Sequence, residues 1–140
     1  MLNEKSCGAV VCSRNNSELI YLLLQYEAGH WDFVKGNVEK GETEQETTVR
    51  ELREETGIAD AQFVDNFRQS ISYFYKRKGS TVRKEVIFFL METKTTKIEL
   101  SFEHVGFEWL TFERAMAKLT FKNARDVLQK ANDFLKKKEK

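Results

Sequence analysis

Residues 36–58 read GNVEKGETEQETTVRELREETGI and contain both the start and the stop signals of a helix. Thr43 is followed three residues later by Glu46, a spacing that lets each residue cap the other's backbone at a helix N-terminus. Gly57 is the residue type that commonly ends a helix, because glycine adopts the left-handed conformation without strain. The segment therefore predicts a helix of about three to four turns between Thr43 and Gly57.

Three carboxylates share one face of this predicted helix. Glu51, Glu54 and Glu55 are spaced i, i+3 and i+4, so their side chains lie within one turn and repel each other. Clustered oxygen ligands suit hard divalent cations, above all Mg²⁺, which retain waters and also bind phosphate oxygens. The alternative is a solvated surface helix whose acids pair with neighbouring bases. Those bases are Arg50, Arg53 and Lys40.

The bulk composition indicates one domain spanning residues 1–140, with enough apolar side chains for a core. The formal charge of +1 lacks the broad basic field expected for duplex nucleic acid. The N-terminus has no signal-peptide layout, and the longest apolar run, residues 86–91, is too short to span a bilayer. We therefore expect a cytoplasmic protein with no membrane partner, and the sequence leaves its oligomeric state open.

The two cysteines are expected to be free thiols that pack in the interior. Cys7 and Cys12 fall in one apolar segment, so about 16 Å of extended chain separates them, beyond disulfide reach. Zinc is also poorly supported, because the chain has only two histidines.

The order of apolar segments predicts a mixed α/β sandwich, with strands first, a helix within the strand set and helices last. Residues 7–12 and 19–24 are expected to form a hairpin. Further extended segments are 31–34, 62–75, 82–91 and 106–110, with 76–81 as a polar loop; helices are expected at 113–119 and 122–135. The basic end, residues 136–140, is interpreted as a solvated helix end in preference to a nucleic-acid-binding arm.

Residues 36–58 match the Nudix box, G-x5-E-x7-R-E-U-x-E-E-x-G-U with U apolar, at every specified position. The matching residues are Gly36, Glu42, Arg50, Glu51, Leu52, Glu54, Glu55, Gly57 and Ile58. A chance match in a chain of this length has a probability on the order of one in ten million. The chain therefore resembles the Nudix hydrolases, which implies an α/β/α sandwich with a mixed sheet and the box as loop-helix-loop.

The resemblance also implies roles for the box residues. The implied metal ligands are Glu51, Glu54 and Glu55, for Mg²⁺ with Mn²⁺ as the alternative. Arg50 would orient these glutamates, and Glu54 is a candidate base for the attacking water. Gly36 and Gly57 would permit backbone turns on either side of the helix, and Glu42 is a structural residue of the box.

Beyond the box, nearly the whole chain resembles the asymmetrical diadenosine tetraphosphate hydrolases. The matching motifs are Cys7-Gly8-Ala9, Leu22-Leu23-Leu24-Gln25, His30-Trp31, Lys35-Gly36, Lys84-Glu85-Val86-Ile87-Phe88, Glu103-His104, Trp109-Leu110 and Leu119-Thr120-Phe121. By position, Tyr73 and Phe121 would stack on an adenine ring. The polyphosphate would meet His30, Lys35 and Lys84, and Glu103 would bind metal or act as the base.

Each of these assignments has a simpler alternative. The aromatic pair could be ordinary core packing, the basic residues could be surface charges, and Glu103 could be structural. The family usually has two prolines in a Trp-x-Pro-Pro-Lys-Gly segment, where this chain has Trp31-Asp32-Phe33-Val34-Lys35-Gly36. Without those prolines, the loop bordering the box is expected to be freer.

The predicted function is metal-dependent, in-line hydrolysis of diadenosine tetraphosphate, a small-molecule dinucleoside polyphosphate, to ATP and AMP. One alternative is removal of pyrophosphate from RNA 5′ ends, since RNA pyrophosphohydrolases share the box. Another nucleoside diphosphate derivative is also a possible substrate within the family. A non-catalytic nucleotide-sensing module is disfavoured, because all three box glutamates are intact. The choice of Glu54 or Glu103 as base stays open.

Overall fold

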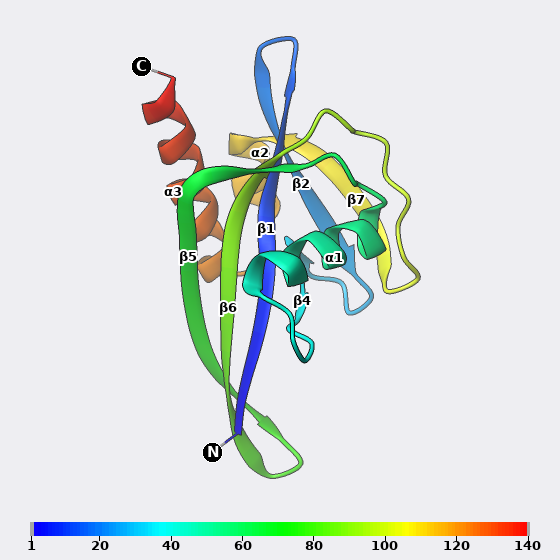
Figure 1. Ribbon diagram of the computed structural model, residues 1–140, viewed down its shortest axis with the longest axis vertical. Coiled ribbons are helices and arrows are strands. Elements are labelled where there is room, and N and C mark those ends of the chain that lie inside the picture. Colours follow the sequence, from blue (N-terminus) through cyan, green and yellow to red (C-terminus); the bar gives the residue numbers. More distant parts are fainter. Residues whose placement is uncertain (1, 140) are drawn as a thin grey trace.

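The computed structural model describes residues 2–139, whose strands form a mixed sheet with helices on both faces (Figure 1). The strands are β1 (Leu2–Asn15), β2 (Glu18–Tyr26), β3 (Trp31–Asp32), β4 (Val34–Asn37), β5 (Gln62–Arg77), β6 (Ser80–Glu92) and β7 (His104–Thr111). The helices are α1 (Glu44–Thr56), α2 (Phe112–Lys118) and α3 (Lys122–Lys138). Met1 and Lys140, the outermost residues of the predicted domain and of the basic end, lie outside the described residues.

Strand β1 organises the sheet, because it pairs with three other strands. It runs parallel to β6 from the Leu2–Val82 pair to the Cys12–Glu92 pair. On its other edge, its first half pairs antiparallel with β4 and its second half with β2, as the expected hairpin. The outer strands continue this pattern, since β5 pairs antiparallel with β6 and β7 with β2.

Alternating side chains of β1 divide the core into two layers. Val10 and Cys12 pack in the cluster that contains the buried side chains of α2 and α3. Ala9 and Val11 point the other way, into the cluster that contains Leu52 of α1. Because successive residues of a strand face opposite sides, a strand covered on both faces is apolar throughout. The α/β/α sandwich is thereby confirmed, and both cysteines are buried free thiols as expected.

The predicted helix of the box is present with both of its expected caps. The Glu46 amide donates to Thr43 Oγ1 at 3.1 Å, and the Thr43 amide donates to Glu46 Oε1 at 2.9 Å. Gly57 ends α1 with a φ of 79°, and its amide donates to the Arg53 carbonyl. These contacts satisfy backbone groups that a helix end leaves unpaired, which explains why the local sequence signals were sufficient.

Two segments differ from the expected boundaries. The predicted loop 76–81 is mostly strand, since β5 runs to Arg77, a tight turn follows, and β6 begins at Ser80. The predicted strand 31–34 is divided at Phe33 into β3 and β4, and β4 continues through Gly36. Phe33 and Val34 are both buried, one in each core layer, so the expectation of a freer loop here is wrong.

Candidate active site

Glu51, Glu54 and Glu55 of the box face a cleft of about 520 Å³ bounded by α1, β4 and the segment just before β7. Its lining residues are Lys35, Gly36, Asn37, Glu39, Arg50, Glu51, Glu54, Glu55, Ser101, Phe102 and Glu103. All the predicted carboxylate ligands therefore come together here, although about fifty residues separate α1 from Glu103. The fold thus concentrates negative charge in one open cleft.

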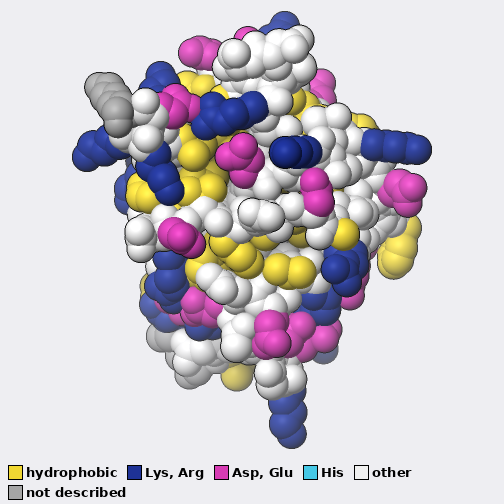
Figure 2. Space-filling model, turned by 45° about the horizontal axis from the view of Figure 1, so that its top comes forward, with side chains coloured by type: hydrophobic (Ala, Val, Ile, Leu, Met, Phe, Trp, Pro, Cys, Tyr) yellow, Lys and Arg dark blue, Asp and Glu magenta, His cyan; other side chains and the backbone are white. Residues whose placement is uncertain are grey.

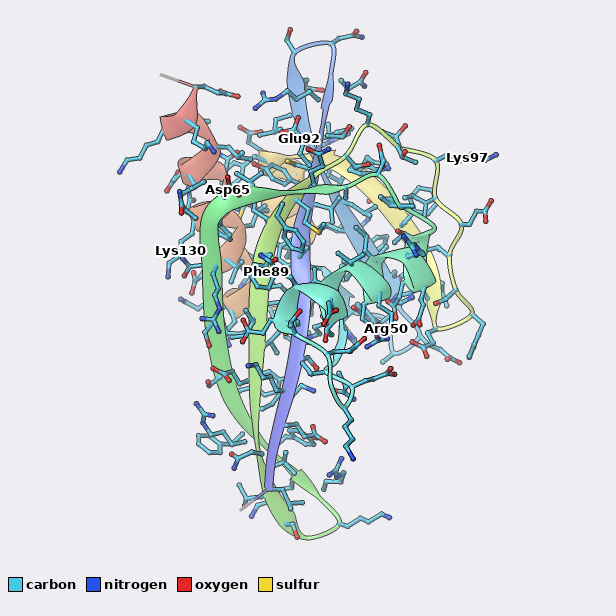
Figure 3. All side chains as sticks on the ribbon, in the orientation of Figure 1. Arg50, Asp65, Phe89, Glu92, Lys97 and Lys130 are labelled. Atoms are coloured by element: carbon cyan, nitrogen blue, oxygen red, sulfur yellow. The ribbon has the colours of Figure 1, made fainter. Side chains whose placement is uncertain are left out.

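Arg50 holds several of these carboxylates through a fan of hydrogen bonds. Its Nε and Nη2 donate to Glu42 at 2.6 and 3.1 Å, and its Nη1 donates to Glu51 at 2.6 Å and Glu54 at 3.2 Å. A further bond from Nη2 reaches the Asn37 carbonyl of β4 at 3.0 Å. Figure 3 shows Arg50 on the side of α1 that faces β4. These bonds hold the pKa of Glu42 at about 2 and tie the helix to the sheet.

Gly36 has a different role from the one expected, because it lies within β4 and makes no turn. An added Cβ there would lie 2.0 Å from Glu51 Cδ, far inside van der Waals contact. The missing side chain therefore makes room for the Glu51 carboxylate against the strand. Burial in this position raises the pKa of Glu51, with the nearby Glu55 carboxylate acting in the same direction. Gly57, by contrast, does make its expected turn.

Glu55 is buried beside His104, a residue to which the sequence assigned no role. Glu55 Oε2 and His104 Nε2 are 2.9 Å apart, with side-chain exposures of 7% and 0%. The two atoms are not aligned as a hydrogen bond, so each lacks a well-directed partner. His104 Nδ1 lies 3.2 Å from Ser101 Oγ. A buried carboxylate oxygen without a partner is costly unless a cation or a donor reaches it.

The acidic cleft has the chemistry for a hard divalent cation but not a complete protein cage. Its possible ligand atoms are carboxylate oxygens. One oxygen of Glu55 is buried without a hydrogen-bond partner, and burial raises the pKa of Glu51 although Arg50 bonds it. Within residues 2–139, no three acidic, histidine or cysteine side chains are arranged as a preformed metal site. Carboxylate oxygens are ligands that hard divalent cations accept, together with water and the oxygens of a phosphate substrate.

The segment between β6 and β7 is anchored on the C-terminal end of α1. The Glu99 amide donates to the Thr56 carbonyl at 2.9 Å, and the Ser101 amide donates to the Glu55 carbonyl at 3.2 Å. These carbonyls have no partner within the helix, so the segment completes the helix end. The anchoring places Glu103, which is exposed, at the rim of the acidic cleft.

A second hollow, the aromatic slot, has a volume of about 220 Å³. It is lined by Asp32, Lys35, Ile71, Tyr73, Phe88, Phe121, Asn123 and Ala124. Tyr73 and Phe121 therefore border the same slot, and they are 37% and 48% exposed. Such exposure disfavours full core packing for this pair and leaves part of each aromatic side chain accessible to a ligand. Lys35 is a lining residue of both the aromatic slot and the acidic cleft, so the two hollows adjoin at this residue.

The three predicted basic residues occupy different positions around these hollows. Lys35 Nζ lies 3.2 Å from Asp32 Oδ2. Lys84 donates to Asn37 Oδ1 at 2.8 Å, and its burial lowers its pKa. Lys84 is not a lining residue of either hollow, but Asn37 is.

His30 is the third basic residue, and it belongs to a row of aromatic rings. Its ring stacks on Tyr26 at 4.7 Å and lies 5.4 Å from Phe121 of the aromatic slot. Tyr26 in turn contacts His104 edge-on at 4.5 Å. The sequence had assigned no function to Asp32, Asn37 or His104. His104 lies within a motif of the resemblance, whereas Asp32 and Asn37 stand at unspecified positions of the segments that carry it.

A larger hollow, of about 730 Å³, lies away from the box at the C-terminal end of α3. Its charged residues include Arg14, which pairs with Glu139 at 2.5 Å and Glu92 at 3.7 Å. Figure 2 shows acidic and basic side chains intermixed over this end of the molecule, with apolar side chains between them. Self-paired charges leave little net attraction for a charged ligand, so this hollow is not the candidate site.

Comparison with known proteins gives relatives of nearly the same length. Residues 3–131 match the model of the NUDIX domain family. The chain is 37% identical to the asymmetrical bis(5′-nucleosyl)-tetraphosphatase of Mus musculus, over 94% of this chain and 95% of that protein. The corresponding protein of Sus scrofa is 35% identical over the same shares.

Solved structures agree with these relatives. A binary complex of a C. elegans Ap4A hydrolase superposes with a TM-score of 0.84 and 28% identity, covering 94% of this chain and 97% of that one. The E. coli dihydroneopterin triphosphate pyrophosphohydrolase has a TM-score of 0.73 at 21% identity, over 93% and 97% of the two chains, which shows a shared fold. None of the helices in residues 2–139 is long and apolar enough to cross a membrane.

Proposed function

This chain belongs to the NUDIX domain family, and we propose that it hydrolyses diadenosine tetraphosphate to ATP and AMP with a divalent cation. The observation that carries the proposal is the adjacency of the aromatic slot and the acidic cleft, with Lys35 lining both. A flat apolar slot suits a base, and a carboxylate cluster suits cation-bound phosphates. A dinucleoside polyphosphate supplies these two chemistries in one molecule, and the related tetraphosphatases carry this activity in their names.

Tyr73 and Phe121 bind one adenine by stacking. Tyr73 lies on β5, an edge strand of the sheet, and Phe121 is the residue before α3; both line the aromatic slot. Stacking of a base on an aromatic ring contributes about 1–3 kcal/mol per base and requires no sequence-specific hydrogen bond. One nucleoside is thereby fixed, which sets the distance from the base to the phosphorus that reacts.

The basic residues hold the phosphate chain between the aromatic slot and the acidic cleft. Lys35 stands where the two hollows adjoin, and Lys84 reaches the same region through Asn37. His30 lies beside Phe121, and we assign it to the first phosphates. These charges offset the repulsion between a polyanion and the acidic cleft.

Glu51, Glu54, Glu55 and Glu103 would hold the cation, for which we propose Mg²⁺ with Mn²⁺ as the alternative. A bound divalent cation neutralises phosphate charge and lowers the pKa of water. Arg50 holds the carboxylates of Glu51 and Glu54 in orientation through the hydrogen bonds that its Nη1 donates to both. We also place the enzyme in the cytoplasm, consistent with two free thiols.

The proton of the attacking water goes to a carboxylate at the acidic cleft. Glu54 and Glu103 both line this cleft and both are solvent-accessible, so either can accept the proton. The water then attacks phosphorus in line with the departing phosphate oxygen, and the leaving nucleotide takes the bridging oxygen. The chain contributes positioning and charge compensation, and no covalent intermediate with the protein is required.

The test is product analysis by ion-exchange chromatography after incubation with diadenosine tetraphosphate and Mg²⁺. ATP and AMP in equal amounts are the expected products. Glu54→Gln is the test variant, since it removes one charge at constant volume from a side chain that is 58% exposed. We expect this variant to fold normally and to lose about 10²–10⁴-fold in kcat if Glu54 is the base.

Two results would contradict this proposal. Two molecules of ADP would mean symmetric cleavage, and the phosphate register would be wrong. Absence of cleavage by folded protein in Mg²⁺ would overturn the substrate, and 5′-triphosphorylated RNA would be the next compound assayed. Near-wild-type turnover by Glu54→Gln would move the base to Glu103.

A further inference from the structure

We infer that His104 positions the Glu55 carboxylate for the divalent cation, and so sets the affinity of the acidic cleft for metal. The inference rests on the proposed function, because it assumes that Glu55 is a cation ligand. Its basis is separate, however: a buried imidazole lies 2.9 Å from a buried carboxylate oxygen that has no well-directed partner. His104 touches neither hollow directly, so it is a positioning residue.

The surroundings of the ring indicate which nitrogen carries the hydrogen. A carboxylate can only accept, so a favourable contact with Glu55 requires the hydrogen on Nε2. Nδ1 is then free to accept from the Ser101 hydroxyl, whose oxygen lies 3.2 Å away. One neutral tautomer therefore directs a hydrogen to the Glu55 side and an acceptor to Ser101, although the contact with Glu55 is not aligned as a hydrogen bond. At metal sites, a ligating carboxylate is commonly held in its orientation by a hydrogen bond from a neighbouring residue that does not itself bind the metal.

The ring of His104 is fixed on its other sides as well. Tyr26 packs edge-on against it at 4.5 Å, and the Tyr26 hydroxyl donates to the Phe33 carbonyl at 2.7 Å. The His104 amide donates to the Ser101 carbonyl at 3.2 Å, and Tyr26 and His104 are partners across β2 and β7. The imidazole thus has little freedom to turn away from Glu55, as a positioning residue requires.

A purely structural role would leave the cation affinity unchanged once the chain is folded, and this difference provides the test. Loss of an outer partner of a metal ligand usually weakens metal binding about 10–100-fold. His104→Leu removes both nitrogens and keeps an apolar side chain against Tyr26. His104→Gln is the matched control, since its amide nitrogen can donate from nearly the same place as Nε2.

The measurement is Mn²⁺ binding to substrate-free protein, followed by electron paramagnetic resonance of the unbound ion. We expect His104→Leu to bind Mn²⁺ about 10–100-fold more weakly than wild type, and His104→Gln to stay within about threefold. Urea unfolding of both variants shows separately what the substitution costs in stability. Wild-type Mn²⁺ affinity in folded His104→Leu would overturn the inference and leave the proposed function standing. Failure of the wild-type protein to bind Mn²⁺ would overturn both.

A second measurement covers the case in which His104→Leu does not fold. The ¹⁵N chemical shifts of the His104 ring in wild-type protein report which nitrogen carries hydrogen. Hydrogen on Nε2, with a change in its shift when Mg²⁺ is added, supports the positioning role. A ring that carries hydrogen on Nδ1 alone would overturn it, since Nε2 could then donate nothing to Glu55.

Discussion

Replacing Gly36 with alanine should displace the Glu51 carboxylate from the acidic cleft. The new Cβ would stand 2.0 Å from Glu51 Cδ and 2.2 and 2.3 Å from its two oxygens. Ordinary contact begins at 3.4 Å, so the carboxylate has to retreat by about 1.4 Å, the difference between 3.4 and 2.0 Å. Arg50 opposes that retreat, because it holds one of these oxygens at 2.6 Å.

The expected cost follows from this geometry. Overpacking of this kind commonly lowers the free energy of unfolding by about 1–3 kcal/mol. The effect on catalysis should be of similar size in free energy, since a misplacement of about 1 Å in an active site can cost on the order of 10²-fold in rate, or about 2.7 kcal/mol. We therefore expect Gly36→Ala to remain folded at room temperature with a kcat lowered about 10²-fold.

The assay pairs urea unfolding with initial rates of diadenosine tetraphosphate cleavage, for Gly36→Ala and for Gly106→Ala. Gly106 is the matched control, because it also lies in a strand and its added Cβ would meet its nearest neighbour at 3.4 Å. We expect Gly106→Ala to leave kcat unchanged and stability altered by less than about 1 kcal/mol. A Gly36→Ala enzyme within threefold of wild-type kcat would refute the reasoning, because Glu51 could then be moved without consequence.

Three further substitutions test other parts of the structure. Tyr73→Ala should raise the KM for adenine nucleotides about 5–150-fold with kcat nearly constant, as loss of one stacking contact predicts; an unchanged KM in steady-state kinetics would place the base elsewhere. Asn132→Ala removes the acceptor of the buried Tyr21 hydroxyl, 2.7 Å away, and should lower the free energy of urea unfolding by about 1–3 kcal/mol without changing KM. Hydrogen bonds from Arg68 hold the pKa of Glu44 at about 2, below its usual 4.5, so Glu44 stabilises the fold above pH 4.5 and this contribution is lost as pH falls toward 2. Urea unfolding of Glu44→Gln against wild type should therefore show a difference that shrinks with acid, and a constant difference would contradict this.

The box helix and its caps were predictable because their determinants are local. Thr43, Glu46 and Gly57 act on backbone groups within one turn of themselves. The i, i+3, i+4 spacing places Glu51 and Glu55 on one face in any helix. The layer architecture was predictable for a similar reason, because the unbroken apolar run of β1 can be buried only with cover on both faces.

The expectations that failed concern residues whose surroundings come from elsewhere in the chain. Gly36 was expected in a turn, yet its requirement for glycine arises from Glu51, which is fifteen residues away and packs on β4. Phe33 and Val34 were expected in a freer loop, but the two core layers bury them. A local sequence pattern shows neither the contact of Gly36 with Glu51 nor the burial of Phe33 and Val34, because both depend on strands and helices that are distant in the sequence.

By itself, the sequence determined that a capped helix carries Glu51, Glu54 and Glu55 on one face, since helical spacing depends only on the backbone repeat. Tertiary structure alone decided that Glu103 joins them. Glu103 follows a segment whose backbone amides donate to the free carbonyls at the end of α1. Tertiary structure also decided that the aromatic slot adjoins the acidic cleft at Lys35. The physical reason is that strand register and helix packing, which bring together residues far apart in the chain, are set by the burial of the whole core and not by any one segment.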